Sequence, residues 1–335
     1  MTTLKELAKL LNVSISTVSK ALNDSADIGP ETKKRVRDAA ELYNYKPNKM
    51  ALGLKINQTK TIGVIVPDIL NHFFAKVLFG IEKAASEKSY DTIVCISHES
   101  YQNEQQSINV LTNGRVDGFI MSLATETLEK NHVNHLKTSH SIKQPIVLFD
   151  RVSEKINCDK VVIDDQQAIY NATKYLIKSG RQKIAFVSDI AHLEIGGLRQ
   201  EGYKKALNEN GLSTNDQLIL TIDQKDEAHQ DIKRFLLSQD IDAVISADNT
   251  SGIMCVNIAK DLGFKVPKDI AIIGFGDEET SYLSFPQMSY INQNAEDIGR
   301  EATELLIQRL ENKSEKAVNY KTIKMSTSLY PKATT

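Results

Sequence analysis

The chain has 335 residues, of which 41% are hydrophobic and 25% are charged, a composition typical of a globular protein with more than one domain. No run of 18 apolar residues occurs, and the N-terminus MTTLKELAKLL carries charges within its apolar pattern, so we expect neither a membrane span nor an export signal, and a cytoplasmic location. The net charge of −2 conceals an asymmetry, because residues 1–60 carry 11 Lys and Arg against 6 Asp and Glu, and such a basic segment is expected to meet a polyanion.

The first predicted elements are two short helices joined by a tight turn. Asn12 stands where a left-handed residue ends a helix, and Ser14 is the predicted N-cap of the next one. The first helix is indicated by apolar residues at helical spacing: Leu4, Leu7, Ala8 and Leu11. In the second helix the predicted inward residues are Val18, Ala21 and Leu22, and the outward ones are Ser16, Thr17 and Lys20.

A third helix is predicted from DIGPE onward, with Pro30 in its first turn and its end near Asn44. Its expected core residues are Val36, Ala39, Ala40 and Tyr43. Three such helices form a helix-turn-helix domain, in which the start of the second helix enters the major groove of DNA. Hydroxyl groups and a cation at that place suit base edges and phosphates.

The segments LKELAKLLNVSISTVSKALN, IGPETKKRV and YKPNKMALGL closely resemble the head of the lactose/galactose-repressor family of transcriptional regulators. The most specific part is the pattern VSxxTVSxxLN from Val13 to Asn23, and the resemblance continues through the remaining chain. It implies that Ile15, Ser16 and Lys20 read base edges. It implies phosphate contacts from Ser14, Thr17, Ser19 and Asn23. Lys20 replaces the usual Arg of the family and lacks the guanidinium fork for a bidentate guanine contact.

Residues 47–60 are predicted to form a hinge and linker, after a head of residues 1–46. By the resemblance, NKMALGLK folds on DNA as a hinge helix in the minor groove, with Asn48, Ala51 and Leu54 at the DNA and Leu54 as an apolar wedge. The alternative is an ordinary linker. Paired hinge helices require a homodimer, or a larger assembly built from it, on a palindromic double-stranded DNA operator.

From Thr61 onward, apolar strand-like runs alternate with helical patterns in two successive sets. The predicted strands are residues 61–66, 91–96, 117–122, 145–150, 160–164, 183–188, 218–222, 242–247 and 271–276. Such alternation indicates parallel sheets in two lobes. The predicted fold is therefore an all-α helix-turn-helix head plus an α/β two-lobed core, and the resemblance makes this core similar to periplasmic sugar-binding proteins.

The resemblance also implies that the lobes exchange chain at three crossovers, which we expect near Lys160 to Asp164, Ser289 to Gln293 and Tyr320 to Thr322. The core is expected to comprise residues 61–335. Within it, lobe one would comprise about residues 61–161 and 292–321. Lobe two would comprise about residues 162–291 and 322–335.

Ligands of parallel sheets bind beyond the carboxyl ends of the strands, where this sequence has polar residues. The candidates there are Ser122, Asp150, Arg151, Asp164, Asp223, Asp248 and Asp277. Each acid has a helix N-cap as its alternative role, and for Asp248 the two roles are equally favoured. Phe73 and Phe74 match effector-pocket positions of the family, with burial in the core as the alternative for either ring.

Arg199, in GGLRQEGYKKAL, matches the family's RxxG motif, which implies that its guanidinium reaches into the cleft. A surface salt bridge is the alternative. The family's GFDD-like motif is GFGD here, Gly274 to Asp277, so either Asp277 replaces the missing acid or the pocket lacks it. Gln293 in YINQN matches another pocket position.

The motifs of the sequence bear on three classes of function: a regulator, a transport receptor and an enzyme. A transport receptor would need an export signal and no basic head, and a nucleotide-using enzyme should show GxGxxG or GxxxxGK[ST], which do not occur. Cys95, Cys158 and Cys255 are expected to be reduced, and HVNHLKTSH, with His132 and His135 on a predicted exposed helix, is not expected to bind metal. We therefore expect no enzyme, cofactor or metal, but a DNA-binding regulator, a repressor, controlled by a carbohydrate-like effector between the lobes.

Overall fold

The computed structural model describes residues 2–45, 58–113, 115–136, 142, 144–224, 226–311 and 319–335. The chain divides into two compact units, Met1–Thr59 and Lys60–Thr335. The described part of the first unit is helical, whereas the second contains two sheets with helices on their faces. No helix in the described segments is long and apolar enough to cross a bilayer.

The N-terminal unit contains α1 (Leu4–Leu11), α2 (Ile15–Leu22) and α3 (Pro30–Leu42). Each helix contributes two residues to one buried cluster: Leu7, Ala8, Val18, Ala21, Val36 and Ala39. Asn12 has a φ of 53°, so the predicted left-handed end of α1 is confirmed. The three predicted helices are thus present, and their apolar faces enclose a common core.

One expected core residue of this unit is wrong. Tyr43 is exposed, and Tyr45 packs against the helical core in its place. The reason is local, because α3 ends at Leu42 and Asn44 adopts a left-handed φ of 47°. The backbone then turns back, and the Tyr45 amide donates to the carbonyl of Ala40 at 2.8 Å.

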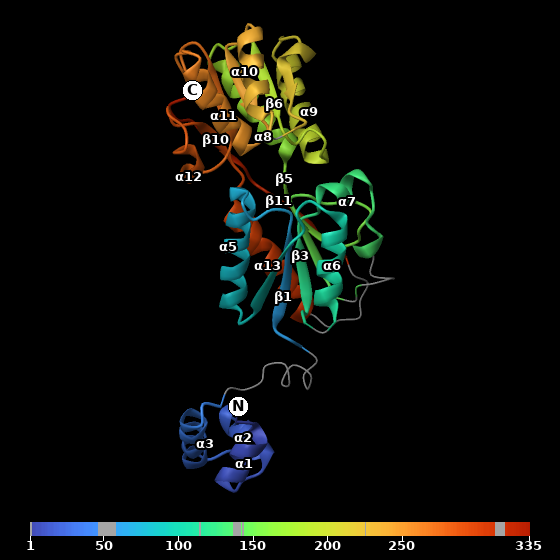
Figure 1. The fold of residues 1–335 in the computed structure, drawn as a ribbon, viewed down its shortest axis with the longest axis vertical. Coiled ribbons are helices and arrows are strands. Elements are labelled where there is room, and N and C mark those ends of the chain that lie inside the picture. The colour runs from blue at the N-terminus through green and yellow to red at the C-terminus, as the bar shows by residue number, and fades with distance from the viewer. Residues whose placement is uncertain are drawn as a thin grey trace. The chain divides into compact units, whose positions relative to one another are not determined.

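The second unit consists of two six-stranded sheets, which define two lobes (Figure 1). The sheet of lobe one has the order β11-β5-β4-β3-β1-β2, and that of lobe two β12-β10-β9-β8-β6-β7. Lobe one contains β1 (Thr61–Val66), β2 (Asp91–Ile96), β3 (Gly118–Met121), β4 (Ile146–Phe149), β5 (Asp159–Ile163) and β11 (Thr322–Met325). Lobe two contains β6 (Ile184–Ser188), β7 (Ile219–Thr221), β8 (Ala243–Ser246), β9 (Ala271–Phe275), β10 (Ser289–Asn292) and β12 (Ser328–Tyr330). All neighbouring strands are parallel except β10 and β12, which are antiparallel.

Helices cover both faces of each sheet, as the nearly continuous apolar runs of the strands require. In lobe one, α5 (His72–Glu87) and α13 (Ala295–Glu311) lie on one face and α6 (Tyr101–Thr112) on the other (Figure 1). Alternation along β1 fits this arrangement, because Val64 belongs to the cluster with α5 and α13 and Ile65 to the cluster with α6. The smaller elements of this lobe are α7 (Thr125–Glu129) and η1 (Asn134–Leu136).

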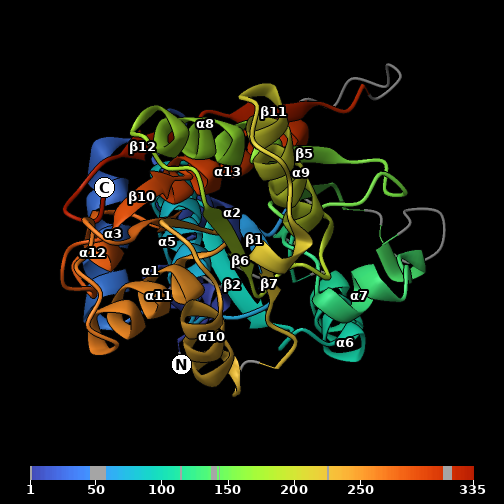
Figure 2. The same cartoon turned by 90° about the horizontal axis from the view of Figure 1, so that it is seen from above.

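Lobe two repeats this layered plan. Figure 2 shows α8 (Asp165–Lys178) and α9 (Glu194–Glu209) on one side of the sheet and α10 (Ala228–Ser238) and α11 (Asn249–Asp261) on the other. Its shorter elements are η2 (Asp216–Leu218) and α12 (Glu278–Ser281). The predicted two-lobed α/β fold with parallel sheets is confirmed.

Within the described segments, the chain passes between the lobes three times. The first passage is at Asp164, between β5 and α8, and the second at Gln293 and Asn294, between β10 and α13. The third was predicted at Tyr320 to Thr322, which is wrong by one strand. β11 pairs in parallel with β5 and so belongs to lobe one, and the chain crosses only at Ser326 and Thr327.

Candidate functional site

The start of α2 presents the predicted base-reading residues to solvent. Ile15, Ser16 and Lys20 are exposed, and Ile15 retains 47% of its surface although it is apolar. An exposed apolar side chain beside polar ones matches the mixed surface of a major groove, where thymine methyl groups alternate with hydrogen-bonding edges. Lys20 Nζ lies 2.8 Å from Asp27 Oδ2, but both side chains are more than half exposed, so the pair is weak and can open for DNA.

The predicted phosphate-contacting residues surround the ends of the same helix. Ser14 caps α2, with its Oγ accepting the Thr17 amide at 3.0 Å, which confirms the predicted N-cap. The Ser14 and Thr17 hydroxyls are 2.8 Å apart. Ser19 is half-buried, and Asn23 is the exposed C-cap of α2. The predicted hinge contacts Asn48, Ala51 and Leu54 lie outside the described residues.

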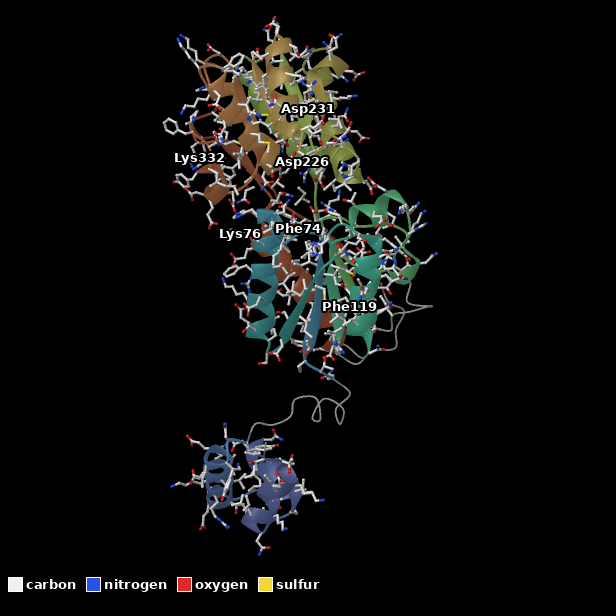
Figure 3. All side chains as sticks on the ribbon, viewed as in Figure 1. Phe74, Lys76, Phe119, Asp226, Asp231 and Lys332 are labelled. Carbon is white, nitrogen blue, oxygen red and sulfur yellow. The ribbon has the colours of Figure 1, made fainter. Side chains whose placement is uncertain are left out.

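A cavity of about 310 Å³ lies between the two lobes and contains most of the predicted effector residues. Figure 3 shows Phe74 at the end of lobe one that faces lobe two. Eight of the eleven candidates line the cavity: Phe73, Phe74, Asp150, Arg151, Arg199, Asp248, Asp277 and Gln293. They come from α5, the end of β4, α9, the ends of β8 and β9, and the second crossover. Segments more than 200 residues apart in the chain therefore share one wall.

Phe73 and Phe74 were predicted either to line the effector pocket or to be buried in the core, and the structure shows both roles. Phe74 is 2% exposed and belongs to the core of lobe one, and its ring contacts Phe149 edge-on at 6.2 Å between centroids. Phe73 is only partly buried and meets Phe74 edge-on at 5.4 Å. Both line the cavity and give it an apolar side against which a flat or ring-shaped ligand can pack.

Arg199 is buried in the wall and is already bonded to protein groups. Its Nε and Nη2 both lie 2.7 Å from Asp165 Oδ1, and its Nη1 donates to the carbonyl of Ala247 at 2.6 Å. The guanidinium carbon lies 3.7 Å from the centre of the Phe275 ring. The fork therefore joins α8, β8 and β9 within lobe two, and a ligand meets a guanidinium whose charge is already balanced.

Arg151 has a matching arrangement in lobe one. Its Nη1 donates to both carboxylate oxygens of Glu99, at 2.9 and 2.7 Å, and to Thr125 at 3.2 Å. Its Nε is buried and has no partner among the described residues. Neighbouring Asp150 has a left-handed φ of 57° and a carboxylate that receives no hydrogen bond from the described residues. Burial raises the pKa of Asp150 to about 6, against the opposing charges of Arg151 and Arg199.

Two of the lining acids are also helix caps, as their alternative role predicted. Asp248 accepts the Ser251 amide at 2.8 Å and begins α11. Asp277 begins α12 in a capping box with Thr280 and also lies 2.7 Å from His72 Nε2. Burial raises the pKa of Asp277, but hydrogen bonds from Thr280 and His72 outweigh it and hold that pKa below its usual value. These carboxylates are fixed by local geometry.

Three predicted effector residues lie outside this cavity. Ser122 is fully buried beyond β3, and its hydroxyl has no partner within the described structure. Asp164 caps α8 by accepting the Gln167 amide at 3.0 Å and lines a neighbouring cavity. Asp223 is exposed after β7, a three-residue strand at the sheet edge. Their strand-end positions were identified correctly, but Ser122 is buried inside lobe one, Asp164 lies at the first crossover, and Asp223 follows an edge strand.

Several lining residues were not predicted from the sequence, among them His72, Lys76 and Phe275. His72 and Lys76 lie on α5 and reach Asp277 and Glu279 in the other lobe, with Lys76 Nζ at 2.6 Å from Glu279 Oε1. The metal-ligand atoms of His72, Asp277 and Glu279 lie within 4.8 Å of one another. The Lys76 ammonium beside Glu279 competes with a cation at that place.

The expected position of His135 on an exposed helix is wrong. Its side chain is 2% exposed, and its Nε2 lies 2.7 Å from Glu104 Oε1, which is completely buried. Glu104 also accepts the Ala124 amide at 2.7 Å and the Thr127 hydroxyl at 2.8 Å. The histidine therefore fastens η1 to α6 inside lobe one. His132 is exposed, as predicted, but it lies between α7 and η1 and not on a helix.

Comparison with known proteins identifies both units. Residues 3–48 match the family described as bacterial regulatory proteins, lacI family, and residues 59–330 match periplasmic binding proteins and sugar binding domain of LacI family. The chain belongs to the LacI family. This confirms the resemblance found in the sequence and the prediction of a DNA-binding transcriptional regulator, not an enzyme.

LacI-family relatives align along nearly the whole chain. The transcriptional regulator RegA of Clostridium saccharobutylicum is 32% identical over 325 residues, covering 95% of this chain and 96% of RegA. Catabolite control protein A of Priestia megaterium is 34% identical over 307 residues, covering 91% of each chain. The lac repressor dimer bound to operator and the anti-inducer ONPF has a TM-score of 0.86 at 20% identity, covering 99% of this chain and 98% of that chain. At that identity the likeness supports the fold.

Proposed function

We propose that this LacI-family regulator is a repressor that binds a palindromic double-stranded DNA operator as a homodimer. Its affinity for the operator would change when a carbohydrate-like effector occupies the cavity between the lobes. The observation that carries the proposal is the exposed start of α2, where Ile15, Ser16 and Lys20 form a mixed apolar and polar surface on a basic unit. Because operator DNA lies in the cytoplasm of bacteria, we place the protein there.

The effector part of the proposal rests on the cavity. Phe73 and Phe74 offer an apolar side, while the Asp150 carboxylate and the Gln293 amide make no hydrogen bond with the described residues. Hydroxyl groups on a ring-shaped ligand would satisfy these polar groups, and the apolar face of the ring would cover the aromatic side. One relative is named as a ribose operon repressor and another as the repressor PurR. A similar solved structure is titled as a CelR-cellobiose complex.

The dimer part rests on exposed apolar side chains. On lobe two, Tyr282, Leu283 and Phe285 are each at least 67% exposed and follow α12 directly. On lobe one, Leu70 is 91% exposed and Phe79 on α5 is 54% exposed. Patches of this kind mark contact surfaces, and a second copy of the chain would cover both. We further propose that Asn48, Ala51 and Leu54 contact the minor groove in the dimer.

The test is selection of binding sites by the full chain from a random duplex library. We expect a palindromic consensus, binding by two protomers for each site, and a steep fall of affinity with salt as phosphates exchange their counterions for Lys and Arg. A chain of residues 60–335, which is a compact unit, is the control and should select nothing. Equal enrichment of all sequences, or tight binding by the control, would refute the DNA-binding proposal.

A further inference from the structure

Beside the cavity between the lobes, one imidazole and two carboxylates converge. His72 begins α5 in lobe one, whereas Asp277 and Glu279 lie at the start of α12 in lobe two. His72 Nε2 is 2.7 Å from Asp277 Oδ2 and 3.8 Å from Glu279 Oε2. One possible metal-ligand atom from each residue lies within 4.8 Å of those of the other two. The three groups therefore surround one position, and they come from both lobes.

The spacing of these atoms is close to that of the ligands around a zinc ion. Zinc binds imidazole nitrogen and carboxylate oxygen at about 2.0–2.2 Å, so two ligand atoms of a tetrahedral site lie about 3.4 Å apart. The distances from His72 to the two acids, 2.7 and 3.8 Å, fall on either side of that value. The Glu279 side chain is 66% exposed and is free to rotate toward the other two. Small side-chain movements thus separate this arrangement from coordination of an ion.

The donor atoms select the class of ion. Mg²⁺ and Ca²⁺ prefer sites made of oxygen atoms alone, whereas an imidazole nitrogen favours Zn²⁺ and its neighbours among the divalent transition metals. Three protein ligands also leave one position of a tetrahedral site open. His72 and Asp277 both line the cavity, so an ion held between them borders it. A water molecule or an oxygen atom of a bound effector would complete the coordination.

The Lys76 ammonium competes with such an ion for Glu279, but it contacts a different oxygen. Its Nζ lies 2.6 Å from Glu279 Oε1, whereas Oε2 is the oxygen within 3.8 Å of His72. Carboxylates that ligate metals commonly accept a hydrogen bond at the same time. Two carboxylates against one ammonium also leave an excess negative charge, which attracts a cation. Lys76 therefore lowers the affinity for the ion without blocking the site.

We propose that His72, Asp277 and Glu279 bind a divalent transition-metal ion of the Zn²⁺ class, which joins the two lobes and makes the regulator responsive to that ion. This goes beyond the control of DNA binding by an effector, and ion binding itself does not depend on the proposed function. The ion links α5 of lobe one to α12 of lobe two, so it stabilises this arrangement of the lobes over arrangements in which they separate. In the proposed function the lobes control operator affinity, which the ion should therefore change.

The experiment titrates the untagged full chain with Zn²⁺ by calorimetry and with Co²⁺, whose visible absorption reports tetrahedral coordination. His72→Ala removes the nitrogen ligand and should raise the half-saturating Zn²⁺ concentration about tenfold or more, since the loss of even an outer partner of a ligand typically costs that much. Lys76→Met should lower it severalfold, because it removes the competing charge and keeps an unbranched side chain. Such a gain cannot arise from misfolding. Mg²⁺ and Ca²⁺ should not displace Zn²⁺.

His132→Ala is the matched control, because His132 is an exposed histidine that does not line the cavity. It should bind Zn²⁺ as the unmodified protein does. The proposal is overturned if the unmodified protein binds no Zn²⁺, if His72→Ala binds it as tightly as His132→Ala, or if Lys76→Met gains no affinity. Equal weakening by both histidine variants would likewise place the ion elsewhere on the chain.

A second measurement tests the response to the ion. Operator affinity is compared without Zn²⁺ and at a Zn²⁺ concentration that saturates the site. It should change severalfold in the unmodified protein and in His132→Ala, but not in His72→Ala. An operator affinity that Zn²⁺ leaves unchanged in the unmodified protein would overturn the regulatory half of the proposal. Failure to select any operator in the absence of the ion would instead refute the proposed function, so the two failures are distinguishable.

Discussion

Lys20 is the residue of the head at which base reading can be separated from phosphate binding. It is exposed on α2 and pairs only weakly with Asp27. Lys20→Ala should relax discrimination at one base pair in each half-site, by about 1–3 kcal/mol if the contact with the base is direct. Competition binding with single-base variants of the selected operator measures this. Asp27→Asn is the control and should raise affinity for all sequences alike. Uniform weakening by Lys20→Ala would assign Lys20 to a phosphate.

Asp150 gives the core a characteristic dependence on pH. Its pKa of about 6 lies above the ordinary value of about 4, so the folded state holds this proton more tightly than the unfolded chain does. The contribution of Asp150 to the free energy of unfolding should therefore decrease as pH rises through this interval. Asp150→Asn should remove that part of the dependence, as measured by urea unfolding at a series of pH values. The exposed Asp223→Asn should leave the curve unchanged, and parallel curves for Asp150→Asn and the unmodified protein would contradict this.

At the start of α2, one serine caps the helix and a neighbouring serine is exposed for contact with DNA. Ser14 caps the helix through the Thr17 amide, whereas Ser16 is exposed and does not cap it. Ser14→Ala should lower the free energy of unfolding of the head by about 1 kcal/mol, through loss of the cap. Ser16→Ala should leave stability within about 0.5 kcal/mol and weaken only DNA binding. Thermal unfolding of residues 1–59 compares the two, and equal destabilisation would mean that the cap contributes little.

At the scale of elements, the sequence predicted what is encoded locally. Nine strands were found because each is an apolar run flanked by polar residues, and α2 was found because Ser14 and Asn12 mark its boundaries. The strands β10, β11 and β12 were missed, since three or four residues such as SLY form a strand only through distant pairing partners. The displaced third crossover has the same cause, because only the pairing of β11 with β5 assigns it to lobe one.

In the effector cavity, too, the sequence predicted the residues whose positions depend on local order but not the contacts between distant segments. Strand ends and family positions located Asp150, Arg151 and Asp277, because these depend on the local order of strand and loop. The contact between His72 and Asp277 spans 205 residues and depends on how the lobes meet, which no local pattern contains. The pairing of Arg199 with Asp165 was equally hidden, although both residues lie on recognisable helices.

For the whole core, the contacts between α5 and α12 hold the lobes together beside the cavity. His72→Ala removes the hydrogen bond to Asp277 and should lower the apparent affinity for an effector that binds this arrangement of the lobes, because the binding-competent state becomes less populated. Titration calorimetry with a sugar identified by thermal-shift screening measures the change. Arg300→Ala is the control, since Arg300 and Glu87 both belong to lobe one and neither lines the cavity. Equal affinity in His72→Ala would show that this contact does not bias the lobes.

The oligomeric state is testable at the same scale. Tyr282→Asp and Leu283→Asp place a charge in the exposed apolar patch that follows α12. If a second copy covers this patch, burying an unpaired carboxylate there should shift the protein to monomers in sedimentation analysis and reduce operator affinity. Leu237→Asp is the control, because Leu237 on α10 is 64% exposed elsewhere on lobe two. Dimers that persist in both patch variants would place the interface on another surface.

The three crossovers also determine the order in which a ribosome can complete the two lobes. Lobe one starts at Thr61, but the last strand of its sheet, β11, is synthesised only at Thr322–Met325. The helix α5 packs against α13, which is also synthesised late. The sheet of lobe two has five of its six strands once residue 292 has emerged. Lobe one reaches five of its six strands earlier, at residue 163, but the helix α13 that covers one face of its sheet begins only at Ala295. Although domains generally fold in the order of their synthesis, the core of lobe one therefore stays incomplete until five strands of lobe two have been made. Until α13 has been synthesised, the apolar face of α5 in the nascent chain lacks its packing partner. We expect a chaperone to bind that exposed face.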